Sequence, residues 1–182
     1  MTIRTLLLAT AALTLAACGG DDTAVETAST PPPPAAPAPA PAPAPETVVA
    51  FDGPPAEVTI APLGDEMKYE QTEFTVAPGQ TVNLTFTNTA TSAAMRHNVV
   101  VLDPGTDVAQ FGQAAASAAG TDYIPRRLED AIVAHTAMSG PGETVKVTFT
   151  APATPGDYVY ICSYPGHYMT MKGTMRVVAQ PA

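Results

Sequence analysis

After roughly the first quarter of the chain, short apolar runs alternate with turn-forming residues. In the run 81–88, Val82, Leu84 and Phe86 share one face, while the residues between them are polar. The run 144–150 repeats this pattern. Alternation with a period of two is typical of β-strands that bury one of their faces.

Glycine, proline and aspartate clusters separate several of these runs, as expected for turns between strands. The eight expected strands are 57–60, 67–76, 81–88, 97–102, 131–138, 144–150, 157–162 and 171–178. The Ala-rich stretch 107–119 instead predicts a short helical excursion between strands. This spacing predicts an all-β, eight-stranded Greek-key β-sandwich, in which Tyr158 is placed to form a tyrosine corner.

The chain begins with features of a secretory signal. Arg4 precedes the apolar stretch 6–15, which is followed by Leu15-Ala16-Ala17-Cys18. This resembles a bacterial lipobox, in which the cysteine receives a diacylglycerol and becomes the mature N-terminus. We therefore expect a lipoprotein signal peptide over 1–17 and a lipidated Cys18. The alternative is an ordinary signal peptide with an incidental cysteine.

Residues 18–46 form a segment rich in proline and alanine, without apolar periodicity. Such composition predicts disorder, and its proline density favours an extended polyproline II conformation. Residues 31–45 would then reach roughly 45 Å, at about 3.1 Å per residue. We expect a semi-rigid tether, the alternative being filler without a spacing role, followed by one domain over 47–182.

Charge and hydropathy exclude some classes of partner and topology. The chain of 182 residues has a formal net charge of −9, which argues against nucleic acid as a partner. No apolar run reaches the roughly 18–20 residues that a membrane-spanning helix requires. We expect a monomer that is held at a bacterial membrane by its lipid.

A thiol, an imidazole and a thioether lie close together near the end of the chain. Cys162, His167 and Met171 have Cys-x4-His-x3-Met spacing, on a loop between the last two expected strands. Pro165 and Gly166 favour a tight turn within this loop, and His97, from another strand, is the natural fourth donor. Two imidazoles, a thiolate and a weak thioether are the ligand set of blue-copper electron transfer. The pattern therefore predicts one copper ion.

Other metal sites fit the sequence less well. A structural zinc site needs more paired cysteines and histidines. A dinuclear copper centre needs a second cysteine in the loop, and a copper nitrite reductase needs histidines for a second copper site. The chain has three histidines, and we expect the third, His135, to lie on a strand surface. Singly, each of these cysteine, histidine and methionine residues would be interpreted as packing.

The domain resembles azurin and, still more, the auracyanins, which are blue copper proteins of the cupredoxin fold. The resemblance is carried by the motifs Met95-Arg96-His97-Asn98, Ile132-Val133-Ala134-His135-Thr136, Cys162-Ser163-Tyr164-Pro165-Gly166-His167 and Met171-Lys172-Gly173-Thr174. It implies that His97, Cys162 and His167 are equatorial copper ligands and Met171 the axial one. Asn98 and Ser163 would then hydrogen-bond the first ligand segment to the cysteine loop, and His167, ringed by apolar residues, would be the electron port.

Three features depart from the pattern of azurin or of the auracyanins. Arg96 stands where azurin has a glycine whose carbonyl is a fifth, weak copper ligand, and the auracyanins, whose copper is better described as four-coordinate, also lack this glycine. The three residues between His167 and Met171 are azurin-like, one fewer than we expect of auracyanins. The azurin disulfide is absent, because Cys18 and Cys162 have other expected roles. Met169 is a rival to Met171, but the sequence that follows Met171 favours the latter.

These observations predict an electron carrier and not an enzyme. The expected partners are membrane-associated redox proteins, such as c-type cytochromes, a terminal oxidase or a photosynthetic complex. The expected location is extracytoplasmic, at the periplasmic face of a bacterial membrane or at the cell surface. The alternatives are a copper carrier or buffer, and a metal-free scaffold whose site has decayed.

Overall fold

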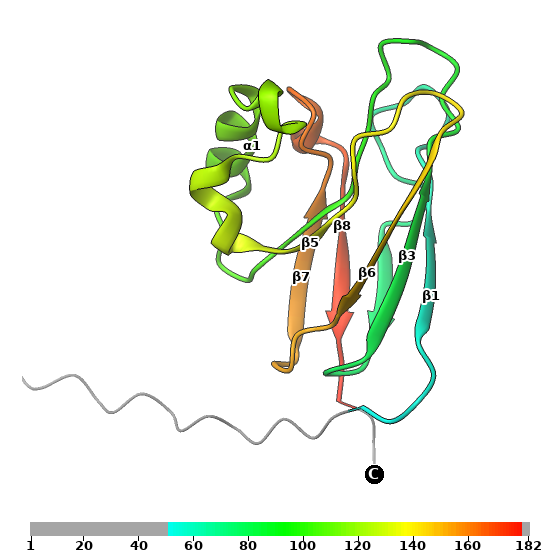
Figure 1. Ribbon diagram of the computed structural model, residues 1–182, viewed down its shortest axis with the longest axis vertical. Helices are drawn as coiled ribbons and strands as arrows, with labels where there is room; N and C mark the ends of the chain where they lie inside the picture. Colours follow the sequence, from blue (N-terminus) through cyan, green and yellow to red (C-terminus); the bar gives the residue numbers. More distant parts are fainter. Residues whose placement is uncertain (1–50, 180–182) are drawn as a thin grey trace, which may run out of the picture. The chain divides into compact units, whose positions relative to one another are not determined.

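The computed structural model describes residues 51–179, which form two packed β-sheets (Figure 1). The first sheet has the order β1 (Ala56–Ile60), β3 (Thr81–Thr87) and β6 (Thr144–Thr150). The second has the order β2 (Glu73–Val76), β8 (Lys172–Val177), β7 (Gly156–Ile161), β4 (Val100–Leu102) and β5 (Ile132–His135). β1 pairs with β3 and β2 with β8 in parallel, whereas the other pairings are antiparallel. The expected eight-stranded β-sandwich is confirmed.

The alternating strands build the core between the sheets. Val82, Leu84 and Phe86 of β3 are each at most 1% exposed. They belong to one cluster with side chains of the opposite sheet, including Tyr160 and Met175. Burying an apolar side chain of this size contributes about 1.5–3 kcal/mol. The period of two in the sequence therefore corresponds to the face that holds the sandwich together.

Strand β4 is buried on both faces of its sheet. Val101 lies in the core between the sheets, whereas Val100 and Leu102 pack with Phe111 and Ala115 in a second, outer core. Those two residues belong to helix α1 (Val108–Ala116), which Figure 1 shows on the side of β5 and β7 away from β3. Coverage of both faces explains why β4 is an uninterrupted apolar run instead of an alternating one.

The expected helical excursion is present but shorter than 107–119. Asp107 caps its N-terminus, because the carboxylate accepts hydrogen bonds from the N–H groups of Ala109 and Gln110. After α1 come two 3₁₀ helices that the sequence pattern did not predict, η1 (Ala119–Thr121) and η2 (Arg126–Ala131).

The expected strand 67–76 was wrong in its first half, since β2 begins only at Glu73. Upstream, the chain makes a tight turn in which the Leu63 N–H donates to the Lys68 carbonyl at 2.9 Å and the Glu70 N–H to the Ala61 carbonyl at 2.9 Å. The buried Tyr69 pairs with Pro62 in an isolated bridge. Tyr69 therefore packs into the core between the sheets from a turn instead of from a strand.

The expected strands 97–102 and 131–138 are also longer than the strands β4 and β5 of the structure. His97 lies outside β4, in an isolated bridge with Ser139, which lies beyond the end of β5. The two backbone hydrogen bonds of this bridge measure 3.0 and 2.8 Å. Both chain segments therefore leave the sheet before the site.

The predicted tyrosine corner is confirmed, because the Tyr158 hydroxyl donates to the Thr154 carbonyl at 2.9 Å. Within residues 51–179, no helix is long and apolar enough to cross a membrane. The predicted signal peptide and the whole of the predicted tether, including Cys18, lie outside the described residues.

Candidate metal centre

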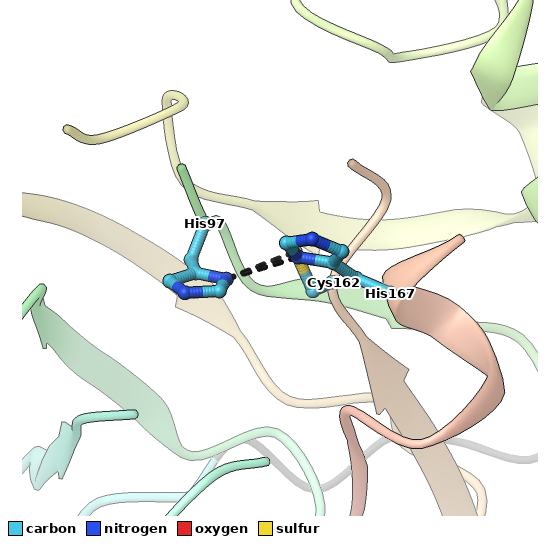
Figure 2. Close-up of side chains that lie close together, drawn as sticks. All are labelled: His97, Cys162 and His167. Carbon is cyan, nitrogen blue, oxygen red and sulfur yellow. Dashed lines mark hydrogen bonds between the residues drawn. The ribbon is translucent and has the colours of Figure 1, made fainter. Parts of the chain in front are cut away.

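Three potential metal ligands converge at one end of the sandwich (Figure 2). Cys162 Sγ lies 3.8 Å from His97 Nδ1 and 3.7 Å from His167 Nδ1, and the two Nδ1 atoms are 3.2 Å apart. All three residues are buried. The structure thus brings together three of the four residues that the sequence predicts as ligands.

The spacing of these atoms fits a single metal ion. Bonds of about 2.0 Å to nitrogen and 2.3 Å to sulfur, as in biological zinc sites, span the separations of 3.2–3.8 Å seen here. The donor set of two imidazoles and one thiolate is that of blue-copper sites. The residues present therefore fit a copper ion.

The ligand loop is closed by backbone hydrogen bonds. Cys162 follows the end of β7, and its N–H donates to the Met171 carbonyl at 3.0 Å. His167 begins the 3₁₀ helix η3 (His167–Met169) directly after Gly166, which has a φ of 83°. Glycine adopts this left-handed conformation without a steric cost. The turn therefore returns His167 toward Cys162, five residues earlier.

His97 is held by a different part of the chain. Beyond the two backbone bonds with Ser139, the Ser139 hydroxyl donates to the His97 carbonyl at 3.0 Å. The side chain of Asn88, which is fully buried, donates to the Ser139 carbonyl at 3.1 Å. Sequence reasoning missed Ser139 and Asn88, whose only signal was their position beside predicted turns. His97 Nε2 is buried without a hydrogen-bond partner among the described residues.

Asn98 and Ser163 connect the two ligand segments directly. Asn98 Nδ2 donates to the Ser163 hydroxyl at 2.9 Å, and the Ser163 N–H donates to Asn98 Oδ1 at 2.9 Å. The hydroxyl of Tyr69 also donates to the Asn98 carbonyl at 2.6 Å. The neighbours of His97 and Cys162 are thereby fixed relative to each other.

The remaining candidate ligands differ in burial. Met171 is 0% exposed and belongs to the same apolar cluster as Cys162, whereas Met169 is 63% exposed. His135 is exposed on β5 and is not part of the group of converging donors, as expected. Arg96 is exposed next to His97.

Burial keeps the site uncharged in the absence of metal. It lowers the pKa of His97 to about 4, aided by the neighbouring His167, and it lowers the pKa of His167 as well. Burial raises the pKa of the Cys162 thiol to about 12, partly opposed by hydrogen bonds from the backbone N–H groups of Asn98 and Tyr164. Both imidazoles are therefore free to donate to a metal at neutral pH, and metal binding must release the thiol proton.

A pair of tyrosines extends from the His167 ring. The Tyr164 ring lies 4.8 Å from the His167 ring, and Tyr123 follows at 5.0 Å from Tyr164. Both tyrosines are half-buried, and His167 is 6% exposed. Tyr123 was missed by sequence analysis because it belongs to the unpredicted segment between α1 and β5.

The match to the family model described as "Copper binding proteins, plastocyanin/azurin family" covers residues 56–178. Auracyanin-A of Chloroflexus aurantiacus is 39% identical over 127 residues, which are 68% of this chain and 75% of the relative. Azurin of Alcaligenes faecalis is 36% identical over 99 residues, which are 53% of this chain and 77% of the relative.

The structural comparison agrees with the sequence comparison. The crystal structure of dithionite-reduced auracyanin from the photosynthetic bacterium Roseiflexus castenholzii matches with a TM-score of 0.63 and 43% identity. The match covers 69% of this chain and 99% of that protein. The predicted cupredoxin fold, the resemblance to azurin and the auracyanins, and the copper cofactor are thus confirmed. This chain belongs to the plastocyanin/azurin family of copper-binding proteins, whose members are blue copper electron carriers and not enzymes.

Proposed function

We propose that this chain holds one type 1 copper ion and carries single electrons between membrane-associated redox proteins. His97, Cys162 and His167 are the equatorial ligands and Met171 is the axial ligand. The observation that carries the proposal is the convergence of three buried donor atoms, all within 4.8 Å of one another. When bound, copper supplies a one-electron Cu(II)/Cu(I) couple.

The protein contributes a site that changes little between the two oxidation states. The Asn98–Ser163 hydrogen bonds and the bridge between His97 and Ser139 hold the ligands from outside. Such outer contacts orient metal ligands and tune their donor strength. Small ligand movement means little reorganisation when an electron arrives or leaves.

His167 is the electron port of the proposed carrier. It is the most exposed of the three donors that converge, and Tyr164 and Tyr123 extend an aromatic surface beside it. Half-buried tyrosines suit weak protein contacts, because each offers an apolar ring and a polar tip. The partners we propose are c-type cytochromes, a terminal oxidase or a photosynthetic complex, reached in brief encounters with small interfaces.

The proposed location is extracytoplasmic, with the lipid on Cys18 in a bacterial membrane and residues 18–46 as the spacer. Two acyl chains suffice for stable anchoring, at about 0.8 kcal/mol per buried CH₂. The sequence around Cys18 supports this part of the proposal.

A copper carrier or buffer is the second candidate, favoured by the exposure of two methionine thioethers, Met67 and Met169, on neighbouring loops. The Thr170 hydroxyl donates to the Met67 carbonyl at 2.9 Å, which joins these two loops. The burial of Cys162 and His97 argues against this function, because ready exchange requires an accessible ion.

Visible and EPR spectra of the copper-loaded protein, with stopped-flow electron exchange against a c-type cytochrome, test the proposal. We expect an intense blue absorption, a narrow copper hyperfine splitting and rapid exchange. In Cys162→Ser the blue band should disappear, because it arises from thiolate-to-copper charge transfer. A colourless wild type would refute the site, and slow exchange with rapid copper release would favour the carrier.

A further inference from the structure

Helix α1 meets the ligand loop at a glycine. Gly112 lies in the middle of α1, is buried, and faces Tyr168 of η3. A Cβ atom at Gly112 would overlap the Tyr168 ring, with Cε1 only 2.6 Å away. Glycine is a poor helix former, so a role for it inside a helix needs another reason. The space taken by the tyrosine ring supplies that reason.

Tyr168 is coupled to His167 through the backbone of η3. The His167 carbonyl accepts hydrogen bonds from the N–H groups of Thr170 at 3.1 Å and Met171 at 2.8 Å. The Tyr168 ring packs against the outer core that includes Phe111 of α1. A displacement of this ring therefore moves the short helix that begins with His167.

The middle of the ligand loop, residues 162–171, forms few hydrogen bonds with the rest of the chain. Its hydrogen bonds to segments beyond the loop and the metal site involve Ser163 and Thr170, near its two ends. The His167 N–H donates to the Tyr164 carbonyl within the same loop, at 3.0 Å. Besides the stacking of Tyr164 on His167, the contact of Tyr168 with α1 is a support from outside the loop at the residue next to His167.

We propose that Tyr168 is a positioning residue for His167. The absence of a side chain at Gly112 makes room for the Tyr168 ring against α1, so that α1 sets the orientation of this histidine. The inference rests on the proposed function only in treating His167 as a copper ligand. It gives the helical excursion a role at the site in addition to covering the sheet.

Gly112→Ala is the test, with Gly120→Ala as its control, because a Cβ at Gly120 would meet no atom within 4 Å. In the metal-free protein, we expect Gly112→Ala to speed hydrogen exchange at the His167 and Met171 amides about tenfold. The His167 ring resonances should shift, and the copper-loaded protein should show a changed EPR hyperfine splitting. Gly120→Ala should alter none of these.

A double variant separates positioning from general destabilisation. In a Tyr168→Ala background, Gly112→Ala should no longer change amide exchange, because the ring that it displaces is gone. Should Gly112→Ala fail to fold, Tyr168→Leu alone must still speed hydrogen exchange at the His167 and Met171 amides by more than it speeds exchange at amides outside η3. The proposal is overturned if Gly112→Ala raises the melting temperature, as alanine in an open helical position does, and leaves the His167 signals unchanged. Because exchange is measured without copper, failure of the proposed function would appear separately, as a missing blue band.

Discussion

At the scale of single residues, burial distinguishes two methionines that are two positions apart. Met171 is enclosed in the core cluster that contains Cys162, and its backbone is hydrogen-bonded to both Cys162 and His167. Met169 is exposed to solvent. A long, weak thioether contact to copper would require a buried sulfur, so of these two methionines we propose Met171 as the fourth ligand.

Met171→Leu should retain copper and the blue band but raise the reduction potential, because a weak donor to Cu(II) is lost. The swap nearly conserves volume, so the stability loss should stay below about 1.5 kcal/mol. Spectroelectrochemical titration of the copper-loaded variant measures the potential.

Met169→Leu is the matched control for this substitution, and it should leave the potential unchanged. A shift in Met169→Leu together with an unchanged potential in Met171→Leu would assign the axial position to Met169. Unchanged potentials in both variants would mean that the site lacks an axial thioether.

The buried histidines make the stability of the metal-free protein dependent on pH. Burial, with a smaller effect of His167, lowers the pKa of His97 from 6.5 to about 4. Between these values the unfolded chain binds more protons at His97 than the folded chain does. The free energy of unfolding should therefore fall as the pH is lowered from 6.5 to 4, by up to about 1.4 kcal/mol per pH unit from this group.

Urea unfolding of the metal-free protein at several pH values across this window measures that slope. A stability that is flat between pH 6.5 and 4 would contradict the burial of an uncharged His97.

At the scale of structural elements, the site depends on bonds between segments that are distant in the sequence. Asn98 and Ser163 are separated by 65 positions, yet their buried groups form two hydrogen bonds of 2.9 Å. Asn98→Ala would leave the Ser163 N–H and hydroxyl without these partners, at a cost of about 1–3 kcal/mol for each buried group. We expect a lower melting temperature and a shifted reduction potential.

Ser163→Ala is a graded control, because it removes the hydroxyl but keeps the bond from the Ser163 N–H to Asn98 Oδ1. Its effect on melting temperature and potential should be smaller than that of Asn98→Ala. Equal effects would show that the backbone bond contributes nothing measurable.

The elements that the sequence predicted well are those whose pattern reflects one buried face. The runs that became β3 and β6 alternate strictly, and their paired residues, such as Leu84 with Val147, point into the sandwich. The cysteine loop was equally visible, since the donors and the turn residues lie within ten positions. Local sequence determined both.

The parts that were not predicted depend on contacts between distant segments. The run 67–76 was interpreted as one strand, but Tyr69 lies outside β2 and its hydroxyl donates to the Asn98 carbonyl. Likewise, the reason for Gly112 appears only once Tyr168, far along the chain, is placed beside it. Tertiary contacts overrode the local strand pattern at 67–72, and they explained why a glycine lies inside α1.

At the scale of the whole molecule, the proposed lipid anchor would hold the electron carrier near a membrane while its domain reaches both the electron donor and the electron acceptor. The Pro/Ala-rich segment would provide a spacer of roughly 45 Å for the domain. The net charge of −9 favours partners that present a basic surface, and it makes association sensitive to ionic strength. Both properties belong to the assembled chain and not to the copper site.

Cys18→Ala tests this arrangement without touching the copper-binding domain. In a bacterial host, the wild-type chain should sediment with membranes and incorporate labelled fatty acid, whereas the variant should do neither. The domain is unaltered, so the variant should keep the blue band and react with a soluble c-type cytochrome as the wild type does. Its exchange with membrane-bound partners should slow, because the tether no longer keeps the domain concentrated near them. A wild-type chain without fatty acid would instead support ordinary signal cleavage and an incidental cysteine.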